Sequence, residues 1–379
     1  MIRGLVDSFR VVRPRNVAQT QKRVEAVSAD VRELQDAIRE IRTTLKQQAR
    51  DDQRGRAAFE RELGGARRTA QKEIATVSAE LEALRTQIAE LQRREQQLRA
   101  IAEREAALDG DLTSLCEIMR DGPVRAHVQQ QVAAATVEQH PCPLVVVDDV
   151  LPEPLYRSAL LGVPPAELFT DRTVNRRHLS VPFRLGPEYG RRVWTYMART
   201  VVRDMLVDAV VEQFRPALCE WLRLNFPRAG EHVLDRIRIT SSDGRIMLRT
   251  RGYTAPPHRD PRWGFITGLL YLARDSDDRS WGTQFYDVEE DQEAQSVAPL
   301  WIDRARCRLV KDVPFVPNRL LLFLNSTGAH GASIPADLSD AVERYVYQVR
   351  IAPDANSIAW LMNSIPPEKR SLWAGKVSD

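Results

Sequence analysis

Apolar residues recur every three or four positions through most of the first third of the chain. One series comprises Val24, Val27, Val31, Leu34, Ile38, Ile41 and Leu45, and a second comprises Ile74, Val77, Leu81, Leu84, Ile88, Leu91 and Leu98. The spacings alternate between three and four, with Glu95 as the one polar interruption of the second series, and place these residues on one stripe of a helix, at the a and d positions of a left-handed coiled coil. A long α-helical coiled coil is therefore predicted over residues 17–108.

The two apolar series are out of phase with each other. Leu45 and Ile74 differ by 29 positions, one more than four heptads, and the interval contains Gly55, Gly64 and Gly65, which weaken a helix. A phase break with a weak or locally unwound helix is expected near residues 46–73. Stripes this regular usually pair with a partner chain, so a homo-oligomer is predicted, either a dimer or a trimer. The alternative is one long helix that folds back on the rest of the chain.

Residues 1–16 form a separate basic amphipathic segment ahead of the predicted coil. Residues 1–12 combine one apolar helical face with two nearby arginines, namely Ile2, Leu5, Val6 and Phe9 with Arg3 and Arg10. Such a helix suits peripheral contact with a membrane interface, and it suits docking on protein equally well.

The composition is that of an ordinary globular protein. Of 379 residues, 43% are apolar and 28% are charged, and the formal net charge of +3 provides no global field for binding nucleic acid. No run of 18 apolar residues is present, and the first residues lack the apolar core of a secretory signal. The four cysteines are scattered without a CxxC spacing: Cys116, Cys142, Cys219 and Cys307. We therefore expect a cytoplasmic protein in a reducing compartment.

From about residue 109 the sequence is typical of a globular α+β domain. Residues 140–156 predict a strand, a turn and a helix, and residues 190–224 predict an amphipathic helical region broken near Pro216. Short β-type runs follow at 236–240, 245–250, 265–273, 283–288, 319–325 and 344–351. Helices first and many strands afterwards predict a helix-backed sandwich or jelly roll over 109–379, with its β core at about 235–352.

Three residues in this domain have the character of metal ligands. His258 and Asp260 lie two positions apart, and in an extended strand both side chains project to one face; Pro256 and Pro257 favour that extended conformation. His330 follows a strong apolar strand and is expected in a loop of small residues. Two histidines and a carboxylate suit one face of an Fe(II) octahedron, although zinc takes the same ligand types.

A buried arginine would favour an iron site over a zinc site. Iron oxygenases can use a 2-oxo dicarboxylate co-substrate, and its far carboxylate needs a buried cation. Arginine suits this role because its guanidinium pairs with a carboxylate through two bonds and stays charged when desolvated. Arg344 opens the strand after His330 and is preferred, and Arg350 lies on the same face of that strand.

Residues 140–352 resemble the prolyl-hydroxylase-like branch of the Fe(II)/2-oxoglutarate oxygenases. The resemblance rests on HRD (258–260), ITGLLYLA (266–273), WGTQFY (281–286), LLLFLNSTGAH (320–330) and RYVYQV (344–349). It implies a double-stranded β-helix, iron ligands at His258, Asp260 and His330, and co-substrate contacts from Arg344 and Thr267. The family's paired glycines are replaced by Trp281-Gly282, so further co-substrate contacts stay open among Thr250, Tyr253, Thr267 and Arg350.

The resemblance also implies a reaction. Retention of Asp260 favours hydroxylation over halogenation, with 2-oxoglutarate and O2 consumed, an Fe(IV)-oxo formed, succinate and CO2 released, and ascorbate helpful in vitro. No catalytic residue beyond the metal ligands is expected. The substrate is left open among a peptide side chain, a glycan and a small metabolite, with Trp263, Trp281 and residues 289–293 expected at the pocket mouth. Two alternatives remain: a non-catalytic scaffold with a degenerate domain, and a zinc-dependent cupin-like hydrolase or isomerase.

Overall fold

A computed structural model describes most of the chain, in two compact units of residues 1–100 and 101–379. The described ranges are 14–48, 56–108, 111–172, 176–179, 186–242, 244–290, 300–339 and 341–373. The predicted amphipathic segment at residues 1–12 and residues 291–293 of the acidic loop lie outside them. Among the described helices, none combines the length and the apolar character needed to cross a membrane.

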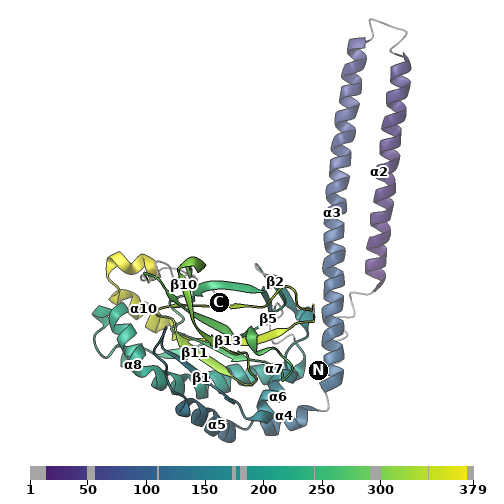
Figure 1. Ribbon diagram of the computed structural model, residues 1–379. Coiled ribbons are helices and arrows are strands. Elements are labelled where there is room, and N and C mark those ends of the chain that lie inside the picture. The colour runs from purple at the N-terminus through teal and green to yellow at the C-terminus, as the bar shows by residue number, and fades with distance from the viewer. Residues whose placement is uncertain are drawn as a thin grey trace. The chain divides into compact units, whose positions relative to one another are not determined.

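The first unit consists of two long helices (Figure 1), α2 (Pro14–Gln48) and most of α3 (Arg56–Leu108). Helix α3 continues through Gly64 and Gly65, so the local unwinding expected at those glycines does not occur. Val24 and Ile88 on the apolar stripes are buried, whereas Ile41 is 48% exposed. The helices are thus as predicted, and their pairing in a coiled coil stays a prediction.

The second unit contains two antiparallel sheets. The larger has the order β1-β11-β7-β13-β5-β3-β2, with β4 also paired to β13, and the smaller has the order β10-β8-β12-β6-β9. The strands are β1 (Leu144–Val147), β2 (Phe169–Arg172), β3 (Arg176–Leu179), β4 (Ile239–Ser241), β5 (Arg245–Arg249), β6 (Thr254–Arg259), β7 (Ile266–Tyr271), β8 (Thr283–Val288), β9 (Leu300–Trp301), β10 (Cys307–Val313), β11 (Leu320–Leu324), β12 (Ala329–Ser333) and β13 (Arg344–Pro353).

Successive strands of this unit cross between the two sheets. Strands β5, β7, β11 and β13 lie side by side in the larger sheet, and β6, β8, β10 and β12 lie together in the smaller one. Eight antiparallel strands distributed in this way form an arrangement of the jelly-roll kind. The two facing sheets agree with the prediction of a helix-backed sandwich or jelly roll.

Helices cover the outer face of the larger sheet (Figure 1). They are α4 (Leu112–Ile118), α5 (Asp121–Ala134), α6 (Glu153–Leu161), α7 (Glu188–Tyr196), a π-helix (Met197–Leu206), α8 (Val207–Asn225), α9 (Val233–Arg236) and α10 (Ala355–Ser364). Side chains alternate along β13, so that Tyr345, Tyr347 and Val349 join the core under the helices. Val346 joins the second core, between the two sheets. The even-numbered face of β13 is therefore the interior face of the sandwich.

The helical run from α7 to α8 differs from the prediction in one respect. Pro216 lies inside α8, so the break expected there is wrong. Buried Phe214 and Leu218 on either side pack into the core under the helices, and this packing holds the helix despite the backbone hydrogen bond that a proline lacks.

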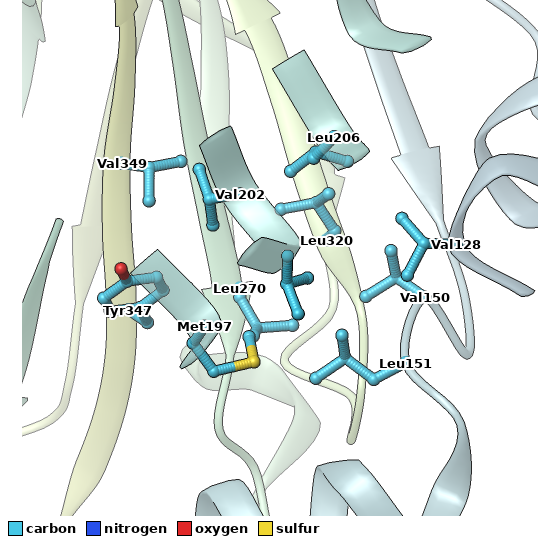
Figure 2. Close-up of a pocket in the computed structure, with 11 residues that line it drawn as sticks. Val128, Val150, Leu151, Met197, Val202, Leu206, Leu270, Leu320, Tyr347 and Val349 are labelled. Atoms are coloured by element: carbon cyan, nitrogen blue, oxygen red, sulfur yellow. The ribbon is translucent and has the colours of Figure 1, made fainter. Parts of the chain in front are cut away.

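A small cavity of ≈ 20 Å³ lies between the helical layer and the larger sheet (Figure 2). It is lined by Val128, Val150, Leu151, Met197, Val201, Val202, Leu206, Leu270, Leu320, Tyr347 and Val349. An apolar void of this size has room for about one water molecule and offers it no polar partners. It is a local packing gap, and the chemistry lies in the other core.

Candidate metal centre

An irregularity in β6 turns His258 into the space between the sheets. In the pairing of β6 with β12, His258 lies opposite His330 and Ala255 lies opposite Ala332. Three steps along β6 thus match two along β12, which leaves one extra residue on β6 at Pro256–Pro257. Bulges re-aim side chains, and proline is tolerated in them because the ladder hydrogen bond is already interrupted. The prolines therefore mark the place where the strand changes face.

The three predicted ligands come together in the structure. One potential ligand atom from each of His258, Asp260 and His330 lies within 4.8 Å of the others, and this is the one such group of three histidine, cysteine or acidic residues found in the described ranges. The two imidazole centroids are 4.2 Å apart, and His330 Nε2 lies 3.9 Å from Asp260 Oδ2. The predicted constellation is thus assembled by the fold.

His330 lies in a strand, so the expectation of a loop was wrong. The small residues of β12 instead allow close approach of its neighbours: a Cβ on Gly331 would lie 2.7 Å from the Ala255 carbonyl oxygen. Glycine within a strand often marks such an approach of another backbone. The absence of a side chain at Gly331 keeps β12 close to β6 and therefore holds the two imidazoles together.

The hydrogen bonds and charges of the three residues are compatible with metal binding. His258 Nδ1 lies 2.9 Å from the Pro256 carbonyl oxygen, which can only accept, so Nδ1 carries a proton and Nε2 is the ring atom that would bind a metal. Burial, reinforced by His258, lowers the pKa of His330 to about 3. Burial opposes ionisation of Asp260, but the imidazoles, Arg350 and a hydrogen bond from Thr267 outweigh it and hold its pKa at about 2.

Asp260 is held in place by Thr267. The Thr267 hydroxyl, fully buried in β7, donates to Asp260 Oδ2 at 2.6 Å, and Asn325 Nδ2 donates to the same hydroxyl oxygen at 3.2 Å. Hydrogen bonds of this type orient a ligating carboxylate. Thr267 was expected to line the co-substrate pocket, and the structure places it against the carboxylate. Asn325 was missed, although it ends the apolar run that precedes His330.

The donor set fits a divalent first-row metal. Two imidazole nitrogens and one carboxylate oxygen converge from β6, β12 and the residue after β6. In a six-coordinate ion, three ligands from one side leave three positions for other molecules, which is the arrangement of non-haem Fe(II) oxygenases. Zinc accepts the same donors tetrahedrally, so the ligands alone leave the choice of metal open.

A second polar site surrounds Arg344 on the interior face of the larger sheet. Arg344 is 4% exposed, and its Nε and one terminal nitrogen donate to the carbonyl oxygens of Trp281 and Gly282. Its guanidinium carbon lies 5.0 Å from the centre of the Phe315 ring and 5.7 Å from that of Tyr271. Burial lowers the pKa of Arg344, and no carboxylate among the described residues forms an ion pair with it.

Two further observations point to an anion at this second site. In the described part of the chain, the indole N–H of Trp281 is buried without an acceptor. Arg249, equally buried, lies directly opposite Arg344 in the pairing of β5 with β13, with its guanidinium carbon 4.8 Å from the centre of the Tyr253 ring. Two arginines of like charge in one buried place are costly unless an anion joins them.

The sequence had left several co-substrate contacts open. Tyr253 lies beside Arg249, whereas Thr250 lies in the turn after β5, where its carbonyl accepts from the Tyr253 N–H. Arg249 and Tyr271 were missed. Burial raises the pKa of Tyr271 to about 12, so its hydroxyl stays protonated, and it donates to Thr283 Oγ1 at 2.7 Å. Arg249 and Tyr271 could have been recognised as polar residues at the alternate strand positions that face the interior.

Arg350 lies at the metal end of β13, away from Arg344. It pairs in register with Thr267, and six residues at roughly 3.3 Å each put its Cα about 20 Å from that of Arg344. Along the strand, these two arginines therefore serve different places, one near the metal ligands and one at the second polar site.

The aromatic residues expected at the pocket mouth lie elsewhere. Trp263 is buried in the core under the helices, where its indole N–H donates to the Trp373 carbonyl, and Trp281 is buried beside Arg344. The exposed aromatic residue near the metal ligands is Trp301, 49% exposed, whose ring lies 4.8 Å from that of His258. Residues 289 and 290 of the acidic loop are exposed.

Comparisons with known proteins give similarity to solved structures alone. No protein-family model and no curated protein matches the chain. A prolyl-4-hydroxylase from Pseudomonas putida matches at 15% identity over 61% of this chain and 100% of its own, with a TM-score of 0.31. HygX from Streptomyces hygroscopicus, solved with nickel, 2-oxoglutarate and hygromycin B, matches at 14% identity over 56% of this chain and 83% of its own, with a TM-score of 0.34.

A third solved structure is of another kind of enzyme. The non-heme alpha ketoglutarate dependent carbocyclase SnoK, from nogalamycin biosynthesis, matches at 14% identity over 62% of this chain and 85% of its own, with a TM-score of 0.31. At these identities and TM-scores, function has to be argued from the residues of the site.

Proposed function

We propose that this chain is an Fe(II)- and 2-oxoglutarate-dependent oxygenase. The observation that carries the proposal is Arg344, a buried guanidinium on the interior face of the sandwich without an ion-pair partner among the described residues. A metal site of His258, Asp260 and His330 faces the same interior. A metal site and a buried cation that share one interior suit a co-substrate that chelates with one end and carries a carboxylate at the other.

Each group has a defined part in this proposal. Fe(II) would be held by His258, Asp260 and His330, and when bound it supplies the redox chemistry that couples O2 to oxidation of a C–H bond. Arg344 pairs with the far carboxylate of 2-oxoglutarate through two bonds, while the Trp281 indole N–H is available as another donor. Thr267 holds Asp260 in its ligating orientation. The ring of Phe323, 4.6 Å from that of His330, keeps the metal face apolar.

The retained carboxylate favours hydroxylation of the substrate. With Asp260 as a third protein ligand beside His258 and His330, a six-coordinate Fe(II) would keep two positions for the co-substrate and one for O2, and none for a halide. A peptide side chain, a glycan or a small metabolite stays open as substrate. The reaction releases succinate and CO2.

The proposal is tested by binding and by turnover. Anaerobic titration of the Fe(II)-loaded protein with 2-oxoglutarate should give a charge-transfer absorption band, and under air with ascorbate it should release succinate. We expect His258→Ala to lose both, and Arg344→Met to weaken 2-oxoglutarate binding at least 100-fold while Fe(II) still binds. Arg157→Gln, which removes an exposed arginine on α6, is the matched control.

The rival functions give different results in the same experiment. A folded wild-type protein that binds neither Fe(II) nor 2-oxoglutarate points to a scaffold. Activity that requires zinc and ignores 2-oxoglutarate points to a cupin-like hydrolase or isomerase. Either result overturns the oxygenase proposal.

We also propose that the apolar stripes of α2 and α3 join copies of this chain. The stripes are incompletely covered within one chain, with Ile41 48% exposed. Sedimentation equilibrium of the full chain should give a multiple of 43.1 kDa, and Ile41→Asp should lower that mass. Thr44→Asp, off the stripe and exposed, is the control. A wild-type mass of one chain contradicts the proposal.

A further inference from the structure

We infer that Arg350 binds an anionic group of the molecule that is oxidised, beside the metal and apart from the co-substrate. This inference rests on the proposed function and deepens it, because it assigns a chemical class to the substrate. The class is an organic acid, carrying a carboxylate or a phosphate close to the carbon that reacts.

The position of Arg350 places its side chain on the same side of the site as the proposed metal ligands. Its backbone pairs with Thr267, whose hydroxyl donates to Asp260. Its aliphatic chain runs against Gly264, where an added Cβ would lie 3.1 Å from Arg350 Cδ. Gly264 closes the turn that follows Asp260, with its N–H donating to the Pro261 carbonyl at 3.0 Å. The guanidinium thus extends from β13 toward the loop next to the metal-binding carboxylate.

Among the described residues, none forms a hydrogen bond or an ion pair with the Arg350 guanidinium. Its Nε is buried, and within the part of the chain that the structure describes it has no hydrogen-bond acceptor, nor does Arg350 form an ion pair there. The Asp260 carboxylate accepts a hydrogen bond from Thr267 and none from Arg350. Buried donors without acceptors are rare in folded proteins, and at a candidate active site they indicate a ligand.

Counting charges gives the sign of that ligand. A divalent metal brings two positive charges, and Asp260 together with the chelating carboxylate of 2-oxoglutarate cancels them. The far carboxylate of 2-oxoglutarate is assigned to Arg344. Arg350 is then left with one positive charge beside a neutral metal complex, and a carboxylate or phosphate fits its guanidinium through paired bonds.

The neighbouring surface supports a substrate of modest size. Trp301 lies opposite His258 in the pairing of β6 with β9, and its exposed ring contacts the imidazole. Arg350 and Trp301 are therefore associated with different ligands of the same metal. A substrate anchored by its anion at Arg350 can lie across the metal and rest on this ring.

The test uses small probe anions and the full chain. The protein is loaded with Mn(II) and 2-oxoglutarate without O2, and the paramagnetic relaxation of acetate methyl protons and of inorganic phosphate ³¹P is titrated. Acetamide is the neutral probe. Mn(II) relaxes nuclei that bind near it, so the readout reports binding beside the metal without requiring turnover.

We expect Arg350→Gln to weaken binding of the preferred anion at least tenfold, and Arg350→Lys to weaken it less. Arg157→Gln should leave it unchanged, and acetamide should bind to none of these proteins. Tighter acetate indicates a carboxylate-bearing substrate, and tighter phosphate a phosphorylated one. The inference is overturned if Arg350→Gln binds the anion with unchanged affinity, or if acetamide binds as well as the anions do. It is also overturned by an adventitious anion only, that is, if the relaxation of the anion nuclei is the same in Arg350→Gln as in the wild type.

The same samples separate this inference from the proposed function. If the wild-type protein does not bind 2-oxoglutarate, the proposed function fails and the charge count fails with it. If 2-oxoglutarate binds normally and the Arg350→Gln variant binds the anions as tightly as the wild type, the inference alone is wrong. If Arg350→Gln weakens 2-oxoglutarate instead, Arg350 serves the co-substrate, which also contradicts the inference.

Discussion

Replacement of Thr267 by valine tests whether the hydrogen bond to Asp260 prepares the metal site. Valine keeps the shape of threonine and removes the hydroxyl that donates to Asp260 Oδ2 at 2.6 Å. The hydrogen bond is buried and its acceptor is ionised, so a bond of this kind contributes about 1.5–3 kcal/mol to the free energy of unfolding. Loss of a group that orients a metal ligand typically lowers affinity by about 10–100-fold, or roughly 1.4–2.7 kcal/mol. The two magnitudes agree.

The assay is calorimetric titration of the metal-free protein with Co(II), followed by anaerobic Fe(II). Thr267→Val should raise the metal Kd by about 10–100-fold, and Thr267→Ser, which keeps the hydroxyl, should stay near wild type. A valine variant that binds metal within twofold of wild type refutes the reasoning. If metal binding is unchanged and 2-oxoglutarate binding falls instead, Thr267 lines the co-substrate pocket, as the family resemblance implies.

Three further substitutions probe the frame around the site. Gly331→Ala should separate β12 from β6, because its Cβ would lie 2.7 Å from the Ala255 carbonyl oxygen; we expect a loss of about 1–3 kcal/mol in chemical denaturation and weaker metal binding. Asn318 has a φ of +57° and its side chain forms two hydrogen bonds with the Leu151 backbone, so Asn318→Ala should destabilise by about 2–4 kcal/mol and Asn318→Gly by less; equal losses would show that backbone strain is irrelevant. Val202→Ile should fill part of the ≈ 20 Å³ cavity and add about 0.5 kcal/mol, and a lowered Tm would mean that the gap cannot accept a methyl group.

The sequence allowed the three candidate metal ligands to be predicted, but not the way in which the chain brings them together. The HxD spacing and a histidine after an apolar strand are local patterns, and they identify His258, Asp260 and His330. The bulge at Pro256–Pro257 depends on register with β12, and register is a property of two strands. The loop expected around His330 fails for the same reason.

The second polar site shows the same limit. Arg344 is recognisable from its place at the start of a strand, whereas its neighbour Arg249 becomes visible only through the order of the larger sheet, which pairs β5 with β13. Trp281 was expected near a surface, but its side chain is buried in the core between the sheets and its carbonyl accepts from Arg344. Residues defined by an interaction between strands distant in the sequence could not be assigned from the pattern of each strand alone.

The two sheets provide different residues of the site. The smaller sheet provides His258 and His330, whereas the larger sheet, backed by helices, provides Thr267, Arg344 and Arg350. A ligand that reaches from the metal to Arg344 must therefore bridge two sheets whose spacing is set by the core between them. Phe323 from the larger sheet is central to that core, because its ring lies 4.6 Å from His330 and 5.3 Å from Phe285.

The spacing of the sheets should accordingly affect metal and co-substrate in different ways. Phe323→Leu leaves His258, Asp260 and His330 in place but removes the ring that separates the smaller sheet from the larger one. Truncating a buried aromatic side chain loses part of the about 3–5 kcal/mol that full truncation to alanine costs, and the sheets can then approach or tilt. Metal affinity should fall less, because Asp260 and the Thr267 that holds it are only seven residues apart in the chain and should move together. Affinity for 2-oxoglutarate, which requires both sheets at the right distance, should fall by tenfold or more. Equal losses for both would mean that the metal site and the Arg344 site are not independently positioned.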